Sequence, residues 1–223
     1  GYDVIHGHRT IFPISLGEAA SWDLPAIEKA ARISAIEASA EGIHWTFSPM
    51  VDIARDQRWG RTMEGAGEDP LLGCLFAAAR VHGFQGKSLA ADDTMMACVK
   101  HFAAYGAAEA GLDYNMVDLS MRTLEEVYLP PYKAGIDAGA MSVMASFNEI
   151  DGIPSTGNPW LMKTVLRDRW GFEGIVVSDY TGDEEMIAAG FARDGRDAAR
   201  IAFLAGGDMS MQSGLYMQYL PGL

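Results

Sequence analysis

The sequence is short of basic residues and of long apolar runs, and each shortage excludes a class of protein. Lys and Arg total 17 against 30 Asp and Glu, a formal net charge of -13, and the basic residues are scattered. Nucleic acid and anionic membrane surfaces are therefore not expected as partners. No apolar run approaches the roughly 18 to 20 residues that cross a bilayer, so no membrane span is expected. The 223 residues, 49% of them hydrophobic, suffice for one sizeable core, and we expect one domain.

Cysteine and the common cofactor motifs are also scarce. Cys74 and Cys98 have no C-x-x-C spacing and no histidine at ligand spacing, and we expect inert core thiols. The absence of G-x-G-x-x-G, P-loop and G-x-S-x-G motifs excludes the usual dinucleotide, nucleoside triphosphate and serine-hydrolase sites, and no cofactor is predicted. The first residue is Gly1 and no signal-peptide pattern follows it. We expect a piece of a longer protein, and the sequence indicates no compartment.

Short apolar runs alternate with longer segments of helical period, as in repeated βα units around a parallel sheet. Six strands are expected, at Tyr2–Ile5, Ile43–Ile53, Met96–Phe102, Ala140–Phe147, Gly174–Ser178 and Gly206–Met211. Helices are expected at Leu24–Ala38, Leu71–Val81, Met121–Leu129, Trp160–Trp170 and Gly195–Ala205, with N-caps at Asp69, Ser120, Asn158 and Asp194. The pattern predicts an α/β fold, a TIM-type (β/α)8 barrel, truncated, with about six βα units. A doubly wound open sheet is the competing topology.

Polar residues that follow the predicted strands are the candidates for chemistry. Asp179 comes directly after the run Gly174–Val177, at the strand end where barrel enzymes hold catalytic groups. An N-cap for a helix beginning near Asp183 is the alternative interpretation. Lys100 and His101 end another strand, and adjacent residues there share a site only at the strand end or at a bulge.

Two further clusters have both a structural and a functional interpretation. The loop 52–69 collects arginines and carboxylates, which indicates an ion-pair network, although Arg61 and Trp59 could flank a ligand. The pair His6-x-His8 has the shape of a metal site and suggests a metal-dependent amidohydrolase. Such a binuclear site needs further histidines after Lys100, and only His101 is there, so no metal is predicted. We expect the two other histidines to be structural: His44 and His82.

Several ordered motifs resemble the N-terminal barrel of glycoside hydrolase family 3 β-glucosidases. They are DVIHGHRTIFP at 3–13, RWGR at 58–61 followed by EGAGEDP at 64–70, KHFAAYG at 100–106 and SDY at 178–180. YLPPYKAGIDAGA at 128–140 and MASFNEIDGIPST at 144–156 fit the same family, and the bacterial periplasmic branch is the most similar. The resemblance covers almost the whole chain.

This resemblance implies a retaining glycosidase that removes terminal non-reducing β-D-glucosyl, or β-xylosyl, residues through a covalent glycosyl-aspartate intermediate. It implies β-linked gluco-oligosaccharides or aryl glucosides as substrates, and a periplasmic or secreted location. Tyr180 stands where the family often has Trp, so the apolar wall beside the sugar is smaller and carries a hydroxyl. The resemblance gives Asp179 as the nucleophile and these residues as substrate-binding: Asp3, Arg61, Lys100, His101, Tyr180 and Phe147.

The family's usual general acid, a Glu, belongs to a domain C-terminal to the barrel. Residues 1–223 are therefore expected to be a partial barrel without that domain, a poor catalyst by itself, and prone to self-association or homo-oligomer formation through exposed sheet edges. A non-catalytic carbohydrate-binding or degenerate barrel is the alternative. The β-N-acetylhexosaminidase branch is disfavoured because KHFAAYG lacks the PGHG sequence of that branch.

Overall fold

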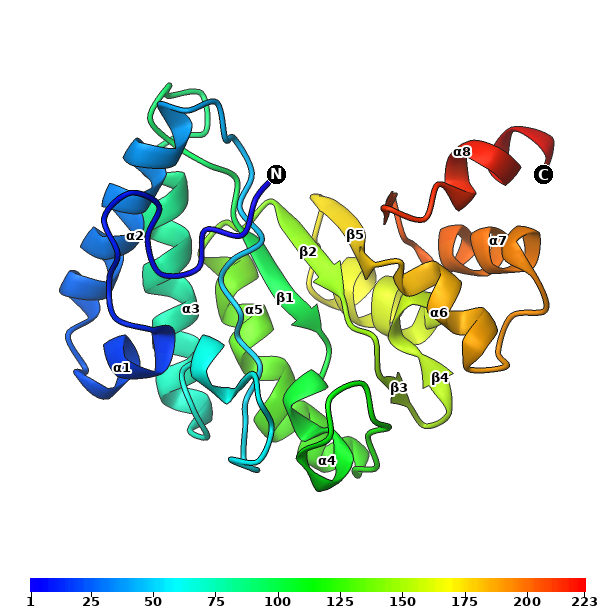
Figure 1. Cartoon of the computed structure of the whole chain (residues 1–223). Helices are drawn as coiled ribbons and strands as arrows, with labels where there is room; N and C mark the ends of the chain where they lie inside the picture. Colours follow the sequence, from blue (N-terminus) through cyan, green and yellow to red (C-terminus); the bar gives the residue numbers. More distant parts are fainter.

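A parallel sheet of four strands forms the centre of the structure, a computed structural model that describes all 223 residues (Figure 1). The strands β1 (Cys98–Phe102), β2 (Ser142–Ala145), β5 (Ile175–Tyr180) and β6 (Met209–Met211) pair in that order, each parallel to the next. A separate antiparallel pair, β3 (Glu149–Ile150) and β4 (Ile153–Pro154), follows β2. The prediction of an α/β fold with a parallel sheet is confirmed.

The first two predicted strands are present only as single bridges. Tyr2 bridges Thr46, Trp45 bridges Met96 and Met50 bridges Lys100, all in parallel. Regular strands over 2–5 and 43–53 were therefore a wrong prediction, and Pro49, which has no N–H to donate, interrupts the second one. All six segments still lie side by side in chain order, without the reversal of a doubly wound sheet, so the competing topology is wrong. The arc does not close on itself within these residues.

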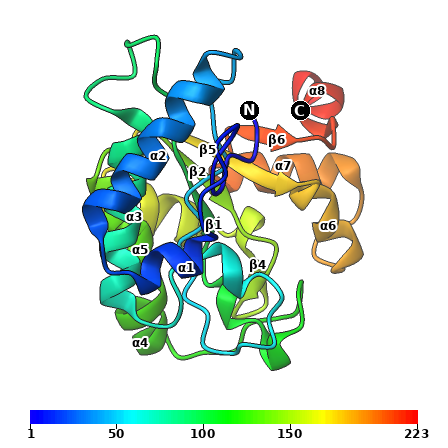
Figure 2. The ribbon, with the colours of Figure 1, turned by 60° about the vertical axis from the view of Figure 1, so that its left-hand side comes forward.

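Helices cover the outer face of this arc. Figures 1 and 2 show α2, α3 and α5 stacked on one side and α6, α7 and α8 gathered beside β6. The α-helices are α1 (Ser15–Ala20), α2 (Leu24–Ser39), α3 (Pro70–Gln85), α4 (Met121–Thr123), α5 (Leu129–Asp137), α6 (Gly182–Ala188), α7 (Gly195–Ala205) and α8 (Leu215–Tyr219). The others are two π-helical segments, η4 (Leu124–Tyr128) and η6 (Trp160–Arg169), and five short 3-10 turns, η1 (Thr62–Glu64), η2 (Tyr105–Ala107), η3 (Glu109–Gly111), η5 (Ser155–Gly157) and η7 (Leu220–Gly222). No helix is both long enough and apolar enough to span a bilayer.

The predicted helix starts are confirmed by side-chain caps. Asp69, Ser120, Asn158 and Asp194 each accept a hydrogen bond from the backbone N–H three residues later. The predicted helix over 121–129 differs, because it changes to the π-helical η4 and then continues as α5. Pro130 and Pro131 lack the N–H groups that would continue a regular α-helical ladder there.

Alternating strand residues pack on the two faces of the sheet. Val99, Val143 and Val176 face the helices and belong to the largest buried cluster. A second cluster on the inner face contains Cys98, Met144 and Val177. Because side chains alternate with a period of two, Lys100 and Asp179 follow Cys98 and Val177 onto that inner face. The sheet therefore points both charged groups toward the inside of the arc.

The two cysteines are free, as predicted. Cys98 lies on β1 and is buried, and its burial raises the pKa of the thiol to about 12. Cys74 lies on α3 and is only half-buried, so its predicted place in the core is not correct. Burial also raises the pKa of Cys74, and the nearby Asp69 carboxylate adds to this effect. Both groups therefore stay protonated thiols near neutral pH.

A buried ion pair holds α1 against α3. Arg80 Nη1 donates to Glu18 Oε2 at 2.9 Å, and the guanidinium lies over the rings of Phe76 and Phe84. Burial raises the pKa of Glu18, although the Arg80 charge opposes it. Removing one partner of such a pair leaves the other charge buried alone and typically costs about 3 to 5 kcal/mol. The pair thereby fixes α1, which follows the N-terminal segment that carries Asp3.

Candidate active site

Asp179 lies at the carboxyl end of β5, one residue before the strand ends. Its side chain does not cap a helix: α6 begins at Gly182, and Thr181 precedes it without a side-chain cap. The N-cap interpretation of Asp179 is therefore wrong. Asp179 is 8% exposed, its Oδ1 accepts the Tyr180 N–H at 2.6 Å, and its buried Oδ2 has no hydrogen-bond partner. A buried carboxylate oxygen without a partner is costly, and such groups concentrate at functional sites.

His101 reaches the same place from β1. The pairing of β1 with β2 shifts register between Val99 and Phe102, and the peptide bond that precedes His101 is cis. The bulge lets His101 and Lys100 both point inward although they are adjacent in sequence. His101 Nε2 lies 3.5 Å from Asp179 Oδ2 and 3.1 Å from Arg61 Nη2. Three of the predicted site residues thus meet at one point.

A fully buried carboxylate, Asp52, holds His101 from the other side. Its Oδ2 accepts both the backbone N–H and Nδ1 of His101, each at 2.9 Å. The hydroxyl of buried Tyr132 donates to Asp52 Oδ1 and lies 2.6 Å from the carbonyl oxygen of His101. Burial raises the pKa of Asp52, but the hydrogen bonds from His101 and Tyr132 outweigh it, so the pKa lies below its ordinary value. Asp52 is therefore an ionised acceptor.

Arg61 is fixed by a two-pronged ion pair with Glu64. Nε and Nη2 of Arg61 donate to the two Glu64 oxygens at 2.8 and 3.1 Å. Burial lowers the pKa of Arg61, but Glu64 and the charges of Asp52 and Asp179 raise it above its ordinary value. The guanidinium lies 5.6 Å from the centre of the Tyr105 ring. Arg61 is thus a permanent, oriented cation beside the free oxygen of Asp179.

Lys100 and Asp3 form the second ion pair of the site. Lys100 Nζ donates to Asp3 Oδ1 at 3.0 Å, and Lys100 is buried while the Asp3 side chain is more than half exposed. The charges of Lys100, Asp179 and Asp3 all act on the Cys98 thiol. Lys100, Asp3 and Asp179 therefore lie near the same residue of the inner face. Asp3 also lines a cavity of about 350 Å³ that it shares with Glu64 and the N-terminal segment.

Aromatic side chains flank this cluster. Tyr180 is 58% exposed next to Asp179. Phe147 packs edge-on against Tyr105, which in turn packs edge-on against His101. Trp59 is 1% exposed and donates its indole N–H to Asp113, so the prediction that it flanks a ligand is wrong. Gly106 permits this packing, because a Cβ there would lie 2.2 Å from the Ile53 carbonyl oxygen.

The remaining histidines lie apart from one another. His6 Nδ1 contacts the carbonyl oxygen of Phe12 at 2.9 Å, and His8 pairs with Glu41. His44 and His82 are exposed. No group of three or more His, Cys, Asp or Glu side chains is arranged to hold a metal ion. The H-x-H pair therefore has local structural partners.

The predicted ion-pair network of the loop 52–69 is present between Asp56 and Arg58 and between Arg61 and Glu64. The position of Asp52 beside His101 was not predicted, and neither was any role for Tyr132. Only the apolar strand that surrounds Asp52 signals this role, because a carboxylate is buried only with partners.

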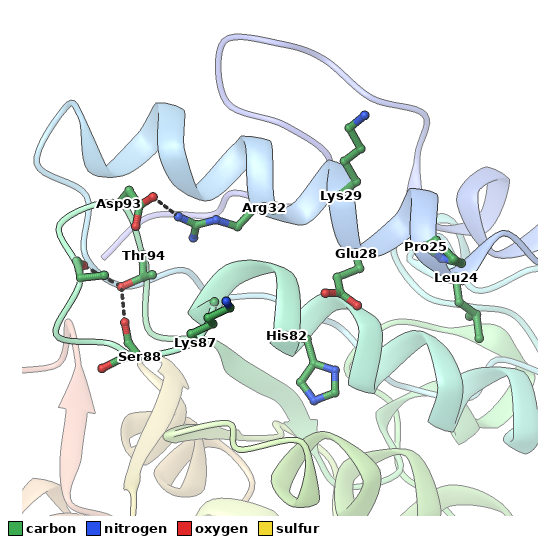
Figure 3. Close-up of a pocket in the computed structure, with 12 residues that line it drawn as sticks. Leu24, Pro25, Glu28, Lys29, Arg32, His82, Lys87, Ser88, Asp93 and Thr94 are labelled. Carbon is green, nitrogen blue, oxygen red and sulfur yellow. Dashed lines mark hydrogen bonds and ion pairs between the residues drawn. The ribbon is translucent and has the colours of Figure 1, made fainter.

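A larger hollow lies elsewhere in the molecule. It measures about 920 Å³ between α2, the end of α3 and the loop that leads into β1, at the opposite edge of the sheet. Figure 3 shows its polar lining, in which Arg32 pairs with Asp93 while Lys29 and Lys87 make no ion pair. We call it the outer hollow. Its size alone does not indicate a site, because its charged side chains are mostly exposed.

A carboxylate and oriented cations at the carboxyl ends of successive parallel strands are typical of barrel-type hydrolases. The sequence profile described as "Glycosyl hydrolase family 3 N terminal domain" matches residues 1–223. The chain belongs to this family, and the resemblance noted from its motifs is confirmed.

Individual relatives agree with this assignment. A periplasmic beta-glucosidase of Salmonella typhimurium is 52% identical over 222 residues, which are 100% of this chain and 29% of that protein. A beta-xylosidase of Formosa agariphila is 36% identical over 214 residues, 94% of this chain and 30% of that protein. The structure of a beta-glucosidase from Listeria innocua superposes with a TM-score of 0.96 at 49% identity, covering 99% of this chain and 31% of that one. The same enzyme has been solved in complex with glucose. The chain thus spans less than a third of these relatives.

Proposed function

We propose that this chain is the nucleophile-bearing, N-terminal barrel part of a retaining β-glucosidase. The observation that carries the proposal is the position of Asp179, whose buried Oδ2 has no hydrogen-bond partner and lies beside Arg61 and His101. In the proposed reaction Asp179 attacks the anomeric carbon and the glycosidic C–O bond breaks. The leaving oxygen takes a proton from a general acid, and water then releases the sugar with its β configuration retained.

Charged side chains suit a neutral sugar, because they distinguish the positions of its hydroxyl groups through strong, directional hydrogen bonds. Arg61, Lys100, His101 and Asp3 are proposed to bind the hydroxyls of one terminal glucosyl unit. Tyr180 and Phe147 are proposed to form the apolar wall toward the leaving group, and their intermediate to high exposure supports this. The proposed substrates are β-linked gluco-oligosaccharides and aryl glucosides.

No carboxylate at the site is free to act as the general acid. Glu64 is bound to Arg61, Asp3 to Lys100 and Asp52 to His101. We propose that the acid comes from a part of the protein outside these 223 residues and that the chain alone is a partial barrel, and the small share of its relatives that it covers supports this. A periplasmic or secreted location is proposed because a relative of 52% identity is named periplasmic.

The test is hydrolysis of aryl β-glucoside and aryl β-xyloside by the full-length protein, with the first-formed sugar followed by proton NMR. We expect faster hydrolysis of the glucoside and β-glucose as the first product. A first product of α configuration would contradict the mechanism. Faster hydrolysis of the xyloside would show that a β-xyloside, not a β-glucoside, is the preferred substrate. Tight sugar binding without hydrolysis would favour a carbohydrate-binding barrel instead.

A further inference from the structure

Five groups fix the surroundings of the His101 ring: Asp52, Tyr132, Arg61, Asp179 and Tyr105. On the Nδ1 side, the Asp52 carboxylate is an acceptor only, and it lies 2.9 Å away with no exposed surface. On the Nε2 side, Arg61 Nη2 lies at 3.1 Å, and a guanidinium is a donor only. The nearest partner of Nδ1 is thus an acceptor, and the nearest partner of Nε2 is a donor, while Asp179 Oδ2 lies farther away at 3.5 Å.

We infer that His101 carries its proton on Nδ1 and presents Nε2 as a hydrogen-bond acceptor, with Asp52 as the positioning residue that enforces this tautomer and Tyr132 as the residue that holds Asp52 in place. In this state Nδ1–H donates to Asp52 and Nε2 accepts from Arg61. The opposite tautomer would put the Nδ1 lone pair against a carboxylate and an N–H against a guanidinium. Both contacts are repulsive, and the one with Asp52 is almost completely shielded from water, so solvent does not relieve it.

The tautomer has a consequence for the unpartnered Oδ2 of Asp179. It lies 3.5 Å from His101 Nε2 and is buried, so a proton on Nε2 would have an acceptor within reach. With the proton on Nδ1, the ring offers nothing to Oδ2 and leaves that oxygen without a hydrogen bond. The tautomer therefore keeps His101 from tying up the carboxylate.

The tautomer also determines which ligand groups His101 recognises, and this step rests on the proposed function. A hydroxyl that takes the place of Arg61 on the single Nε2 lone pair must donate its proton to Nε2, and its oxygen can then accept from Arg61. A fluorine in place of this hydroxyl accepts a hydrogen bond only weakly and donates none. A hydrogen in its place neither accepts nor donates one. His101 is thus a specificity-determining acceptor that requires a donating hydroxyl on the sugar.

The tautomer can be measured without substrate. In protein labelled with ¹⁵N-histidine, long-range ¹H–¹⁵N correlation distinguishes a protonated from an unprotonated ring nitrogen, and the chain has only five histidines. The signal lost in His101→Gln identifies His101. We expect Nδ1 protonated and Nε2 unprotonated near neutral pH. A proton on Nε2 in the unsubstituted protein, alone or with one on Nδ1, would overturn the inference whatever the enzyme activity.

Three variants test the positioning roles. Asp52→Asn replaces an acceptor by an amide that can donate to Nδ1, so the proton can move to Nε2, and we expect kcat/KM on an aryl β-glucoside to fall about 10- to 100-fold. Tyr132→Phe removes one donor to Asp52 but no contact to the ring, so the tautomer should stay and the loss should be smaller. Asp56→Asn, on an exposed carboxylate of the same loop, is the matched control and should change neither. A normal tautomer in folded Asp52→Asn would exclude Asp52 as the cause.

Inhibition by glucose and by its monodeoxy and monofluoro derivatives tests the ligand step, because binding constants are free of the inductive effect by which fluorine slows glycosyl transfer. We expect one ring position at which fluorine weakens binding as much as hydrogen does, and at which both penalties shrink in His101→Ala. If fluorine restores binding at every position, His101 does not act as an acceptor. If glucose itself does not bind, the proposed function fails while the NMR result still decides the tautomer.

Discussion

Charged residues gather at two places in the molecule, the carboxyl edge of the sheet and the outer hollow between α2 and α3. At the carboxyl edge, Asp52, Lys100 and His101 are buried, and each has a defined partner. In the outer hollow, Lys29 and Lys87 are exposed and pair with nothing, although the space is larger. Burial of a charged group costs free energy, and only fixed partners offset this cost. The carboxyl edge, although smaller than the outer hollow, is therefore the place where charged groups are arranged for directed interactions.

Asparagine in place of Asp179 should have the largest effect on activity. The amide cannot form the covalent intermediate, so we expect turnover of an aryl glucoside by the full-length protein to fall by about four orders of magnitude or more while glucose still binds. Kinetics and product-sugar titration on the same preparation check this. Activity within tenfold of the unsubstituted protein would remove Asp179 from the chemistry.

Removal of the Arg61 side chain should have the next largest effect on activity. Arg61→Ala removes charged hydrogen bonds of about 1.5 to 3 kcal/mol, so kcat/KM should fall about 10- to 150-fold, and glucose binding should weaken less. Arg61→Lys keeps the charge but not the two-pronged bond to Glu64, and it should recover only part of the loss. Equal losses in glucose binding and in kcat/KM would instead make Arg61 a uniform binding group.

The unfolding free energy at acid pH allows a buried carboxylate to be compared with an exposed one. The pKa of Asp52 is lowered in the fold, so Asp52 stabilises the protein above its unfolded value of about 3.9, and this contribution is lost as pH falls through the folded value. We expect Asp52→Asn to flatten the fall in unfolding free energy between about pH 5 and 3, by at most about 1.4 kcal/mol per pH unit. Urea unfolding at several pH values measures this.

Asp56 is the exposed counterpart. Hydrogen bonds from Arg58 lower the pKa of Asp56 to about 2, so the sign of its contribution is the same. Solvent and salt screen this pair, so Asp56→Asn should change the slope of unfolding free energy against pH less than Asp52→Asn does. In high salt, the Asp56→Asn protein and the unsubstituted protein should have the same slope. If unfolding free energy depended on pH in the same way in Asp52→Asn and Asp56→Asn, burial of Asp52 would add nothing to its contribution to stability.

Substitution in the outer hollow should have the smallest effect. Arg32 pairs with Asp93 at a partly exposed position, and such pairs contribute about 0 to 1 kcal/mol. Arg32→Gln should leave kcat/KM within twofold and shift the melting temperature by a few degrees at most. A loss of activity comparable to that of Arg61→Ala would show that the outer hollow acts on the chemistry.

The sequence predicted the parts of this structure that depend on local pattern. The apolar run Gly174–Val177 placed Asp179 at the carboxyl end of a strand, and the caps at Asp69 and Asp194 follow from one residue each. The contacts of Asp52 could not be predicted in this way, because they join residues 49 and 80 positions apart through a bulge that no local pattern encodes. Pro49 also interrupts a segment whose composition otherwise favours a strand.

Covalent labelling tests the central claim most directly. An activated 2-deoxy-2-fluoro-β-glucoside has a leaving group that needs no protonation, and its fluorine slows release of the glycosyl-enzyme, so the nucleophile stays labelled. We predict one added fluoroglucosyl group on the peptide that contains Asp179, retained in Glu184→Gln and absent in Asp179→Asn. A label on Asp183, on Glu184 or on any other residue, or turnover of the reagent without a label, would contradict the account.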